Sequence, residues 1–136
     1  MPRILAIDYG AKRTGIAVTD PLKIIASALD TIPTDKVIEF LKKYTQTEAV
    51  EAFVVGMPVN LDGSDTDGTH YVKKFIEELK NVFPAIPIHL QDERFTSKMA
   101  VSAMIAGGMK KKDRQVKGNI DKISATIILQ SFMEKL

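Results

Sequence analysis

The stretch Arg3-Ile4-Leu5-Ala6-Ile7-Asp8-Tyr9-Gly10 decides the fold class of this chain. Its continuous apolar run predicts a buried strand over residues 3–9, because a strand covered on both faces is apolar at every position. Asp8 stands where this strand meets a glycine-containing corner. A buried carboxylate is costly unless a cation or hydrogen-bond donors compensate its charge. We therefore interpret Asp8 either as a site residue or as an acceptor for the backbone of the turn.

Further strands and helices are expected on the C-terminal side of this segment. Strands over residues 15–20 and 24–32 would form an antiparallel meander with the first strand. The pattern then changes to helices and strands in alternation. The expected elements are a helix capped by Thr34, a strand over 52–57, a helix over 72–83, a strand over 86–91, a helix over 96–106 and a final helix capped by Asn119. This order predicts an α/β fold with a five-stranded mixed sheet and helices on both faces.

Length and composition agree with one soluble domain over residues 1–136. Hydrophobic residues make up 45% of the chain and charged residues 26%, which is the balance of an ordinary globular protein. No apolar stretch approaches the ~20 residues of a membrane helix, and the first residues do not resemble a signal peptide. The chain has no cysteine, which excludes disulfides and thiolate metal sites. We expect a cytoplasmic protein that does not contact a membrane.

Positive charge is concentrated in one segment near the C-terminus. The formal net charge is +2, yet eight basic residues and two acidic residues fall between Arg94 and Lys122. The remainder of the chain is mildly acidic. Such a segment is typical of a surface that binds a polyanion, although a solvated lysine-rich loop has the same composition.

Two more positions repeat the pattern of a carboxylate at the end of an element. Asp92 and Glu93 follow a predicted strand, and side-chain alternation puts Glu93 on the face of His89 and Gln91. Either acid could instead serve to start the next helix, where negative charge is favourable. Asp121 lies in the predicted first turn of the final helix and could likewise complement the helix dipole.

Together these carboxylates could hold hard divalent cations. Mg²⁺ and Mn²⁺ take oxygen ligands and usually keep water and substrate phosphate oxygens as further ligands. Two such ions about 4 Å apart can activate water and stabilise the leaving oxygen of a phosphodiester. The loop from Asp8 to Gly15 could also contact phosphate, but it lacks the ending of a Walker A motif.

The motifs in this order resemble the YqgF family of RNase H-like proteins over essentially the whole length. The similarity rests on Ile7-Asp8-Tyr9-Gly10 with Gly15-Ile16-Ala17, on Val54-Val55-Gly56-Met57-Pro58 with Asn60, Asp62 and Gly63, on Asp92-Glu93-Arg94-Phe95-Thr96-Ser97, on Lys110–Lys112, and on Ile120-Asp121-Lys122 with Ala125. Family members are described as Holliday junction resolvases and as nucleases for the 5′ end of precursor small-subunit ribosomal RNA.

The resemblance implies an RNase H-like fold with its first three strands antiparallel. It also implies a metal-dependent nuclease in which Asp8, Glu93 and Asp121 are the catalytic acids and bind Mg²⁺ or Mn²⁺, with two ions expected. The basic residues expected to bind nucleic acid are Lys12, Arg13, Arg94, Lys110, Lys111, Lys112, Arg114 and Lys117.

Several alternatives stay open at this point. The substrate is either structured RNA, as in processing of precursor 16S ribosomal RNA, or branched DNA. The protein could also bind nucleic acid without cutting it, and could be a monomer or a homodimer. An ATPase or sugar kinase of the same core fold would need a second lobe, for which this length leaves no room. The sequence offers no cluster of exposed aromatic residues for stacking on bases, which favours recognition of nucleic acid by backbone and shape.

Overall fold

The computed structural model describes residues 2–20, 22, 25–57, 67–92 and 117–133. Five strands form one sheet in the order β3-β2-β1-β4-β5. The strands are β1 (Arg3–Asp8), β2 (Arg13–Thr19), β3 (Ala26–Pro33), β4 (Val50–Met57) and β5 (Ile88–Asp92).

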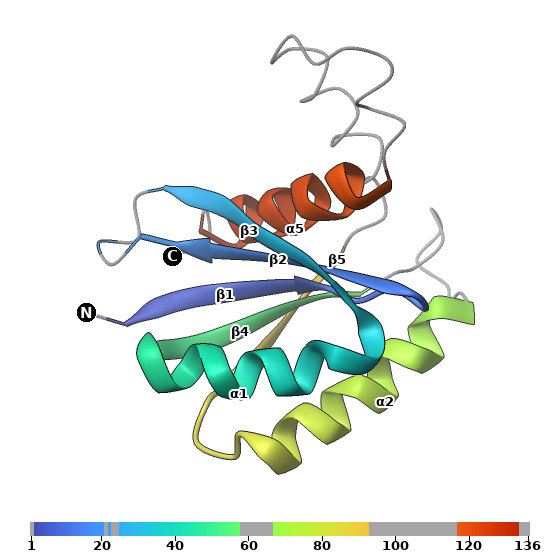
Figure 1. Cartoon of the computed structure of the whole chain (residues 1–136), viewed down its shortest axis with the longest axis horizontal. Helices are drawn as coiled ribbons and strands as arrows, with labels where there is room; N and C mark the ends of the chain where they lie inside the picture. The colour runs from blue at the N-terminus through green and yellow to red at the C-terminus, as the bar shows by residue number, and fades with distance from the viewer. Residues whose placement is uncertain (1, 21, 23–24, 58–66, 93–116, 134–136) are drawn as a thin grey trace, which may run out of the picture.

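The sheet is mixed, as the sequence predicts. β1 pairs antiparallel with β2, and β2 pairs antiparallel with β3. β1 pairs parallel with β4, and β4 pairs parallel with β5. The carboxyl ends of β1, β4 and β5 therefore meet at one edge of the sheet, and the turn from β1 to β2 lies at the same edge (Figure 1).

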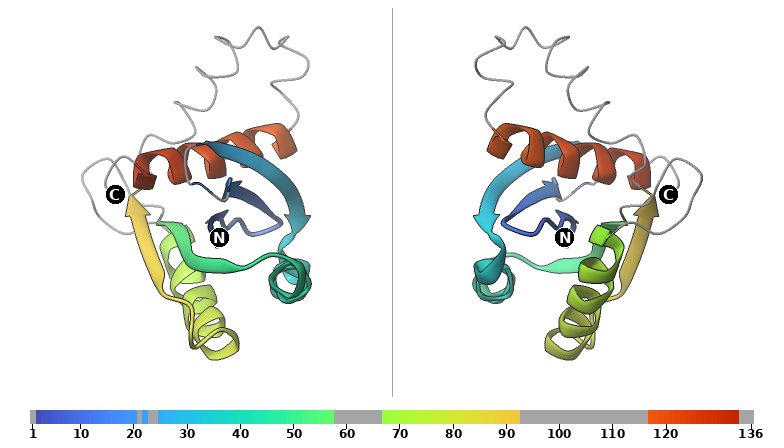
Figure 2. Two further views of the ribbon diagram at one scale, coloured as in Figure 1. Left: turned by 90° about the vertical axis from the view of Figure 1, so that its left-hand side faces the viewer. Right: turned by 90° about the vertical axis from the view of Figure 1, so that its right-hand side faces the viewer.

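Helices cover both faces of the sheet, which confirms the expected layers. The described helices are the short 3₁₀ helix η1 (Thr34–Lys36), α1 (Val37–Thr47), α2 (Asp67–Val82) and α5 (Lys117–Met133). Figure 2 shows α5 on one side of the curved sheet and α1 with α2 on the other. The chain is thus arranged in three layers, with the sheet in the middle.

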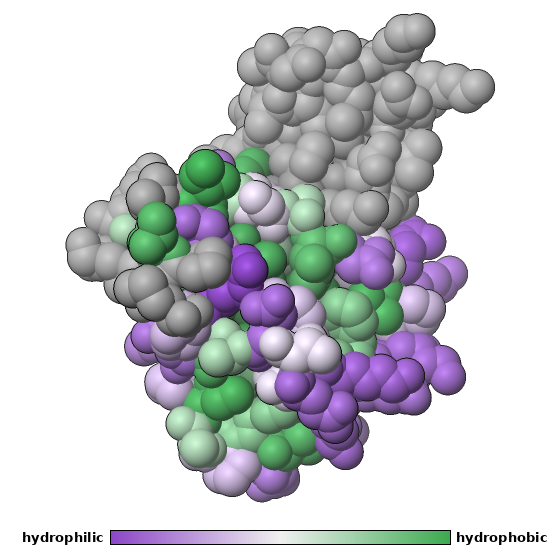
Figure 3. Space-filling view, turned by 60° about the vertical axis from the view of Figure 1, so that its left-hand side comes forward, coloured by the Kyte–Doolittle hydropathy of each residue, from purple (hydrophilic) through white to green (hydrophobic). Residues whose placement is uncertain are grey.

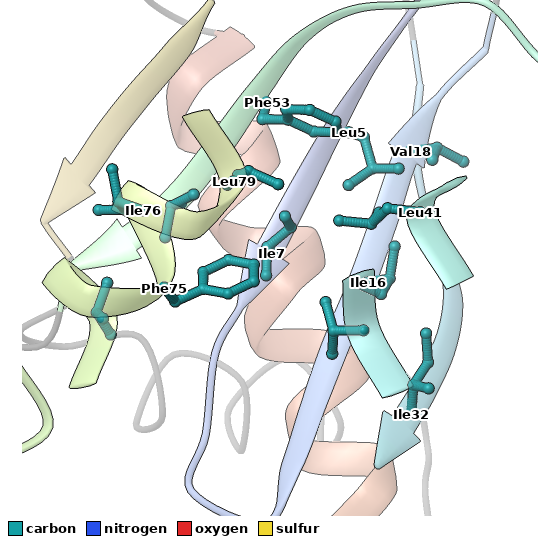
Figure 4. Close-up of a cluster of buried hydrophobic side chains, with 13 residues drawn as sticks. Leu5, Ile7, Ile16, Val18, Ile32, Leu41, Phe53, Phe75, Ile76 and Leu79 are labelled. Carbon is teal, nitrogen blue, oxygen red and sulfur yellow. The ribbon is translucent and has the colours of Figure 1, made fainter. Parts of the chain in front are cut away.

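Two apolar clusters result from the alternation of side chains along the strands. Odd-numbered residues of β1, such as Leu5 and Ile7, pack with Leu41 of α1 and Leu79 of α2 (Figure 4). Even-numbered residues pack under α5, in a cluster made of Ile4, Ala6, Ala17, Val54, Ala125, Ile128 and Leu129. Because β1 is buried on both faces, every one of its central positions is apolar, which is the pattern seen in the sequence.

Two predicted helix caps are wrong. Thr34 belongs to η1 and makes no side-chain capping bond there. Its hydroxyl instead bonds to the carbonyl oxygen of Gly10, because the turn from β1 to β2 lies against the start of η1. Asn119 does not cap the final helix, since α5 begins two residues earlier at Lys117. The helix predicted over residues 96–106 lies outside the described residues.

Figure 3 shows hydrophilic and hydrophobic residues interleaved on the side where β1 and β4 begin. Large apolar side chains that stay exposed include Leu22 and Ile25 beside the turn from β2 to β3. Within the described part of the chain, the helices are too short or too polar to cross a membrane.

Candidate active site

Asp8 is the last residue of β1 and lies at the sheet edge where the parallel strands end. Its side chain is half-buried. Ile4 and Ala6, at the preceding even-numbered positions, pack under α5. Alternation along the strand therefore places the Asp8 carboxylate on the face of the sheet that α5 covers.

The strands on either side of Asp8 present glycine beside it. Gly15 of β2 is its antiparallel partner. In β4, Gly56 follows Val55, which is the parallel partner of Ile7. Both glycines are buried. Because glycine carries no side chain, neither neighbouring strand places a side chain beside Asp8 at these two positions.

Helix α5 brings Asp121 to the same region of the fold. Figure 1 shows α5 running against the direction of β1, so its first residues lie near the edge where β1 and β4 end. Asp121 is the fifth residue of α5, in its second turn rather than its first. Ser124 and Ala125, three and four residues later, are buried against the sheet.

The third predicted carboxylate, Asp92 or Glu93, falls at the end of β5 or just after it in the sequence. Gln91 pairs with Gly56 and is buried, and His89 makes a ring contact with Phe132 of α5 at 5.0 Å between centroids. Both residues thus lie on the α5 face, which is the face of Asp8. Asp92 ends the strand, and Glu93 lies outside the described residues. Among the side chains that the structure describes, no three acids or histidines form a metal-binding cluster.

Three of the eight predicted nucleic-acid-binding residues lie in the described part of the chain, at two places. Lys12 and Arg13 lie at the turn from β1 to β2, at the same edge as Asp8, with Lys12 exposed and Arg13 half-buried. Lys117 is the first residue of α5. The other predicted contacts, Arg94, Lys110, Lys111, Lys112 and Arg114, lie outside the described residues.

The turn that follows Asp8 is held by Thr34, a role that the sequence did not reveal. The Thr34 hydroxyl donates to the Gly10 carbonyl oxygen at 2.6 Å and lies 3.0 Å from the Thr14 hydroxyl. The Thr34 amide donates to the Lys12 carbonyl oxygen at 3.0 Å. Since Thr34 is 24 residues from Gly10, only the folded chain brings these groups together.

A cavity of about 380 Å³ opens beside this turn, on the opposite face of the sheet from Asp8. Tyr9 and Phe75 contribute stacked rings to it, with centroids 4.4 Å apart and planes 20° apart. Burial raises the pKa of Tyr9, and the nearby Glu78 carboxylate raises it further, so the phenol stays protonated at neutral pH. This pair cannot be found from local sequence patterns, because 66 positions separate Tyr9 from Phe75.

Comparison with known proteins identifies the family. The sequence model of the RuvX family, described as Holliday junction resolvase, matches residues 2–135. The chain belongs to the RuvX family. This membership confirms the resemblance that the motifs indicated, since the same family is also called YqgF.

Curated relatives of this RuvX chain share about half of its residues. A protein of Phocaeicola vulgatus is 51% identical over 134 residues, covering 98% of this chain and 96% of its own. A protein of Flavobacterium johnsoniae is 52% identical over 133 residues, again covering 98% and 96%. Each carries the name "Putative pre-16S rRNA nuclease".

Solved structures place the RuvX chain in the RNase H-like fold. T. thermophilus RuvC, in complex with a Holliday junction substrate, aligns with a TM-score of 0.53 over 99% of this chain and 96% of its own. A second structure of Thermus thermophilus RuvC aligns with a TM-score of 0.54, covering 98% of this chain and 95% of its own. The identities are 18% and 15%, so the likeness concerns the fold. It confirms the predicted α/β architecture.

Proposed function

We propose that this RuvX chain is a metal-dependent endonuclease that hydrolyses phosphodiester bonds at the 5′ end of precursor 16S ribosomal RNA. The observation that carries this proposal is the position of Asp8. Its carboxylate ends a buried strand, has glycine on both neighbouring strands, and lies on the face covered by the helix that contains Asp121. The names of the curated relatives supply the substrate.

The ligands of the metal would be Asp8, Glu93 and Asp121. Two of these belong to described elements that meet at one edge of the sheet. For the third, Gln91 and His89 occupy the α5 face of β5. If the alternation continues for two more residues, the next side chain on this face is Glu93 rather than Asp92. This supports Glu93 as the third ligand.

The residues present fit a hard divalent cation. They offer carboxylate oxygens, which Mg²⁺ and Mn²⁺ prefer, and the neighbouring strands add no side chain beside Asp8 because the positions there are glycines. When bound, a pair of such ions supplies an activated water and stabilises the charge on the leaving oxygen.

The remaining residues of the site would position the substrate. Lys12, exposed at the same edge as Asp8, would bind a backbone phosphate of the nucleic acid. Arg13, Arg94, Lys117 and the basic run from Lys110 to Arg114 would bind further phosphates. Each such contact releases a counterion, so we expect affinity to fall steeply as the salt concentration rises.

Cleavage of two substrates tests the proposal. We expect the wild-type protein with Mg²⁺ or Mn²⁺ to cut precursor 16S ribosomal RNA more efficiently than a four-way DNA junction. Asp8→Asn should lower the cleavage rate by roughly 100-fold or more. Even the loss of a residue that only hydrogen-bonds to a metal ligand lowers metal affinity or activity about 10–100-fold. Asp30→Asn, at an exposed position of β3, is the matched control and should cut as wild type does.

Other results separate the alternatives. Faster cutting of the junction would favour a resolvase, which is the description of the family. Binding that survives both EDTA and Asp8→Asn, without cleavage by wild type, would favour a non-catalytic module.

Isothermal titration of Mn²⁺ gives a readout independent of activity. Loss of Mn²⁺ binding in Glu93→Gln, but not in Asp92→Asn, is the result expected for Glu93 as ligand.

A further inference from the structure

The cavity beside the turn from β1 to β2 is built differently from a phosphate site. Its wall includes the stacked rings of Tyr9 and Phe75, and its rim carries Lys12, Asp35 and Glu78. Two carboxylates against one ammonium give this rim a negative balance, which disfavours a phosphate group inside the cavity, while the exposed Lys12 can still contact a backbone phosphate outside it. The combination suits a neutral planar ligand that donates hydrogen bonds.

The Tyr9 ring is a fixed platform for stacking. Its ring packs on Phe75, whose side chain is only 3% exposed, so Phe75 supports Tyr9 from the core. Tyr9 itself is half-buried and lines the cavity. An aromatic side chain held in this way stacks on a nucleobase without losing further conformational freedom.

The cavity also lies beside the proposed cleavage site. Asp8 and Tyr9 are consecutive, and alternation places them on opposite faces at the same sheet edge. Thr34 lines the cavity. It also holds the turn that follows Asp8 and Tyr9, through its hydrogen bonds to the carbonyl oxygens of Gly10 and Lys12. When a nucleic acid chain crosses this edge, its backbone would lie next to Asp8, and a base adjacent to that point would lie next to the cavity.

We propose that this cavity binds one unpaired nucleobase of the substrate, and that its carboxylates select guanine. Guanine donates from N1 and from its exocyclic amino group, side by side on one edge, so a single carboxylate accepts both hydrogen bonds. Uracil offers one donor between two carbonyl oxygens, which the carboxylates repel. The inference rests on the proposed function, because a nucleic acid held at Asp8 is what brings bases to this edge.

Binding of short oligonucleotides without metal tests the inference separately from cleavage. The probes are 5′-fluorescein oligouridines whose central residue is guanosine, inosine or uridine, and the readout is fluorescence anisotropy in EDTA. We expect wild type to bind the guanosine probe about tenfold more tightly than the uridine probe. The inosine probe, which lacks the exocyclic amino group, should lie between them.

Variants of the full chain assign the preference to the cavity. In the double variant Asp35→Asn/Glu78→Gln, the guanosine and uridine probes should bind within about threefold of each other. The matched control is Glu39→Gln/Glu77→Gln, which makes the same charge change at exposed positions of α1 and α2 that do not line the cavity. The control variant loses the same two negative charges, so its affinity for all probes should rise as much as that of the double variant. It should nevertheless keep the tenfold preference for the guanosine probe.

Stacking is tested at Tyr9. Tyr9→Leu should weaken binding of the guanosine probe about tenfold, whereas Tyr9→Phe should keep it, because only the first change removes the ring. If Tyr9→Leu fails to fold, as circular dichroism would show, the double variant still decides the question.

Two results would overturn the inference: equal binding of the three probes by wild type, or an undiminished guanosine preference in the double variant. Neither result bears on cleavage, which depends on Asp8 and metal. Conversely, normal cleavage by Asp8→Asn would contradict the proposed function and leave the base preference standing as an observation.

Discussion

At the scale of single residues, the turn after Asp8 depends on contacts that permit little change. The Gly10 carbonyl oxygen accepts the hydrogen bond from Thr34. A Cβ atom added at Gly10 would overlap the carbonyl oxygen of Arg13, which is backbone and cannot rotate away as a side chain could. Glycine is therefore required here by the close approach of two backbone segments.

We expect Gly10→Ala to lower the free energy of unfolding by about 1–3 kcal/mol, because the turn must shift to relieve this overlap. Urea denaturation followed by circular dichroism measures the change. Ala11→Ser, at the exposed neighbouring position, should change stability by less than about 0.5 kcal/mol. An unchanged midpoint for Gly10→Ala would show that the turn can adjust freely.

At the scale of elements, α5 determines how closely Asp121 approaches the sheet. This helix contacts all five strands of the sheet. Small residues on its buried side allow it to pack closely against them. Ser124 and Ala125 are 2% and 0% exposed, with Ala125 packed in the cluster that contains Ala6 and Ala17. A larger side chain at this position would have to separate the helix from the sheet.

Ala125→Leu should therefore reduce both stability and cleavage. We expect a loss of about 1–3 kcal/mol in the free energy of unfolding, together with weaker Mn²⁺ binding, since Asp121 lies one turn away. Gln130→Leu, at an exposed position of the same helix, is the control and should leave both measurements near wild type. Normal Mn²⁺ binding in a destabilised Ala125→Leu protein would argue against Asp121 as a ligand.

At the scale of the whole molecule, the sheet separates two clusters that stabilise the fold from opposite sides. Leu79 belongs to the cluster under α1 and α2, and Ile128 to the cluster under α5. Both side chains are almost completely buried. Because the sheet lies between them, removing either one leaves a cavity that the other cluster cannot fill.

We expect Leu79→Ala and Ile128→Ala each to cost about 2–5 kcal/mol, and the double variant to cost their sum within about 0.5 kcal/mol. Urea unfolding measured by circular dichroism gives all three values, provided the double variant stays folded without urea. If the double variant unfolds without urea, the milder changes Leu79→Val and Ile128→Val, singly and together, test additivity in the same way. A clear departure from additivity would mean that the two faces are coupled through the sheet.

The amino-acid sequence by itself determined the order of the described elements, the mixed sheet and the position of Asp8 at the end of a buried strand. These features follow from local patterns: apolar runs, helical periodicity and glycine at a corner. The element boundaries differ by a few residues, and the caps at Thr34 and Asn119 are wrong, because a capping residue is recognised only by what its side chain contacts.

The tertiary structure alone decided which groups meet. The glycines beside Asp8, the bond from Thr34 to Gly10 and the stacking of Tyr9 on Phe75 join residues that are far apart in the chain. Such contacts depend on strand order, register and helix placement, and several residue pairs could satisfy the same local pattern. The sequence therefore specified the carboxylate at Asp8, whereas only the folded sheet placed glycines of two other strands beside it and an aromatic cavity on the opposite face.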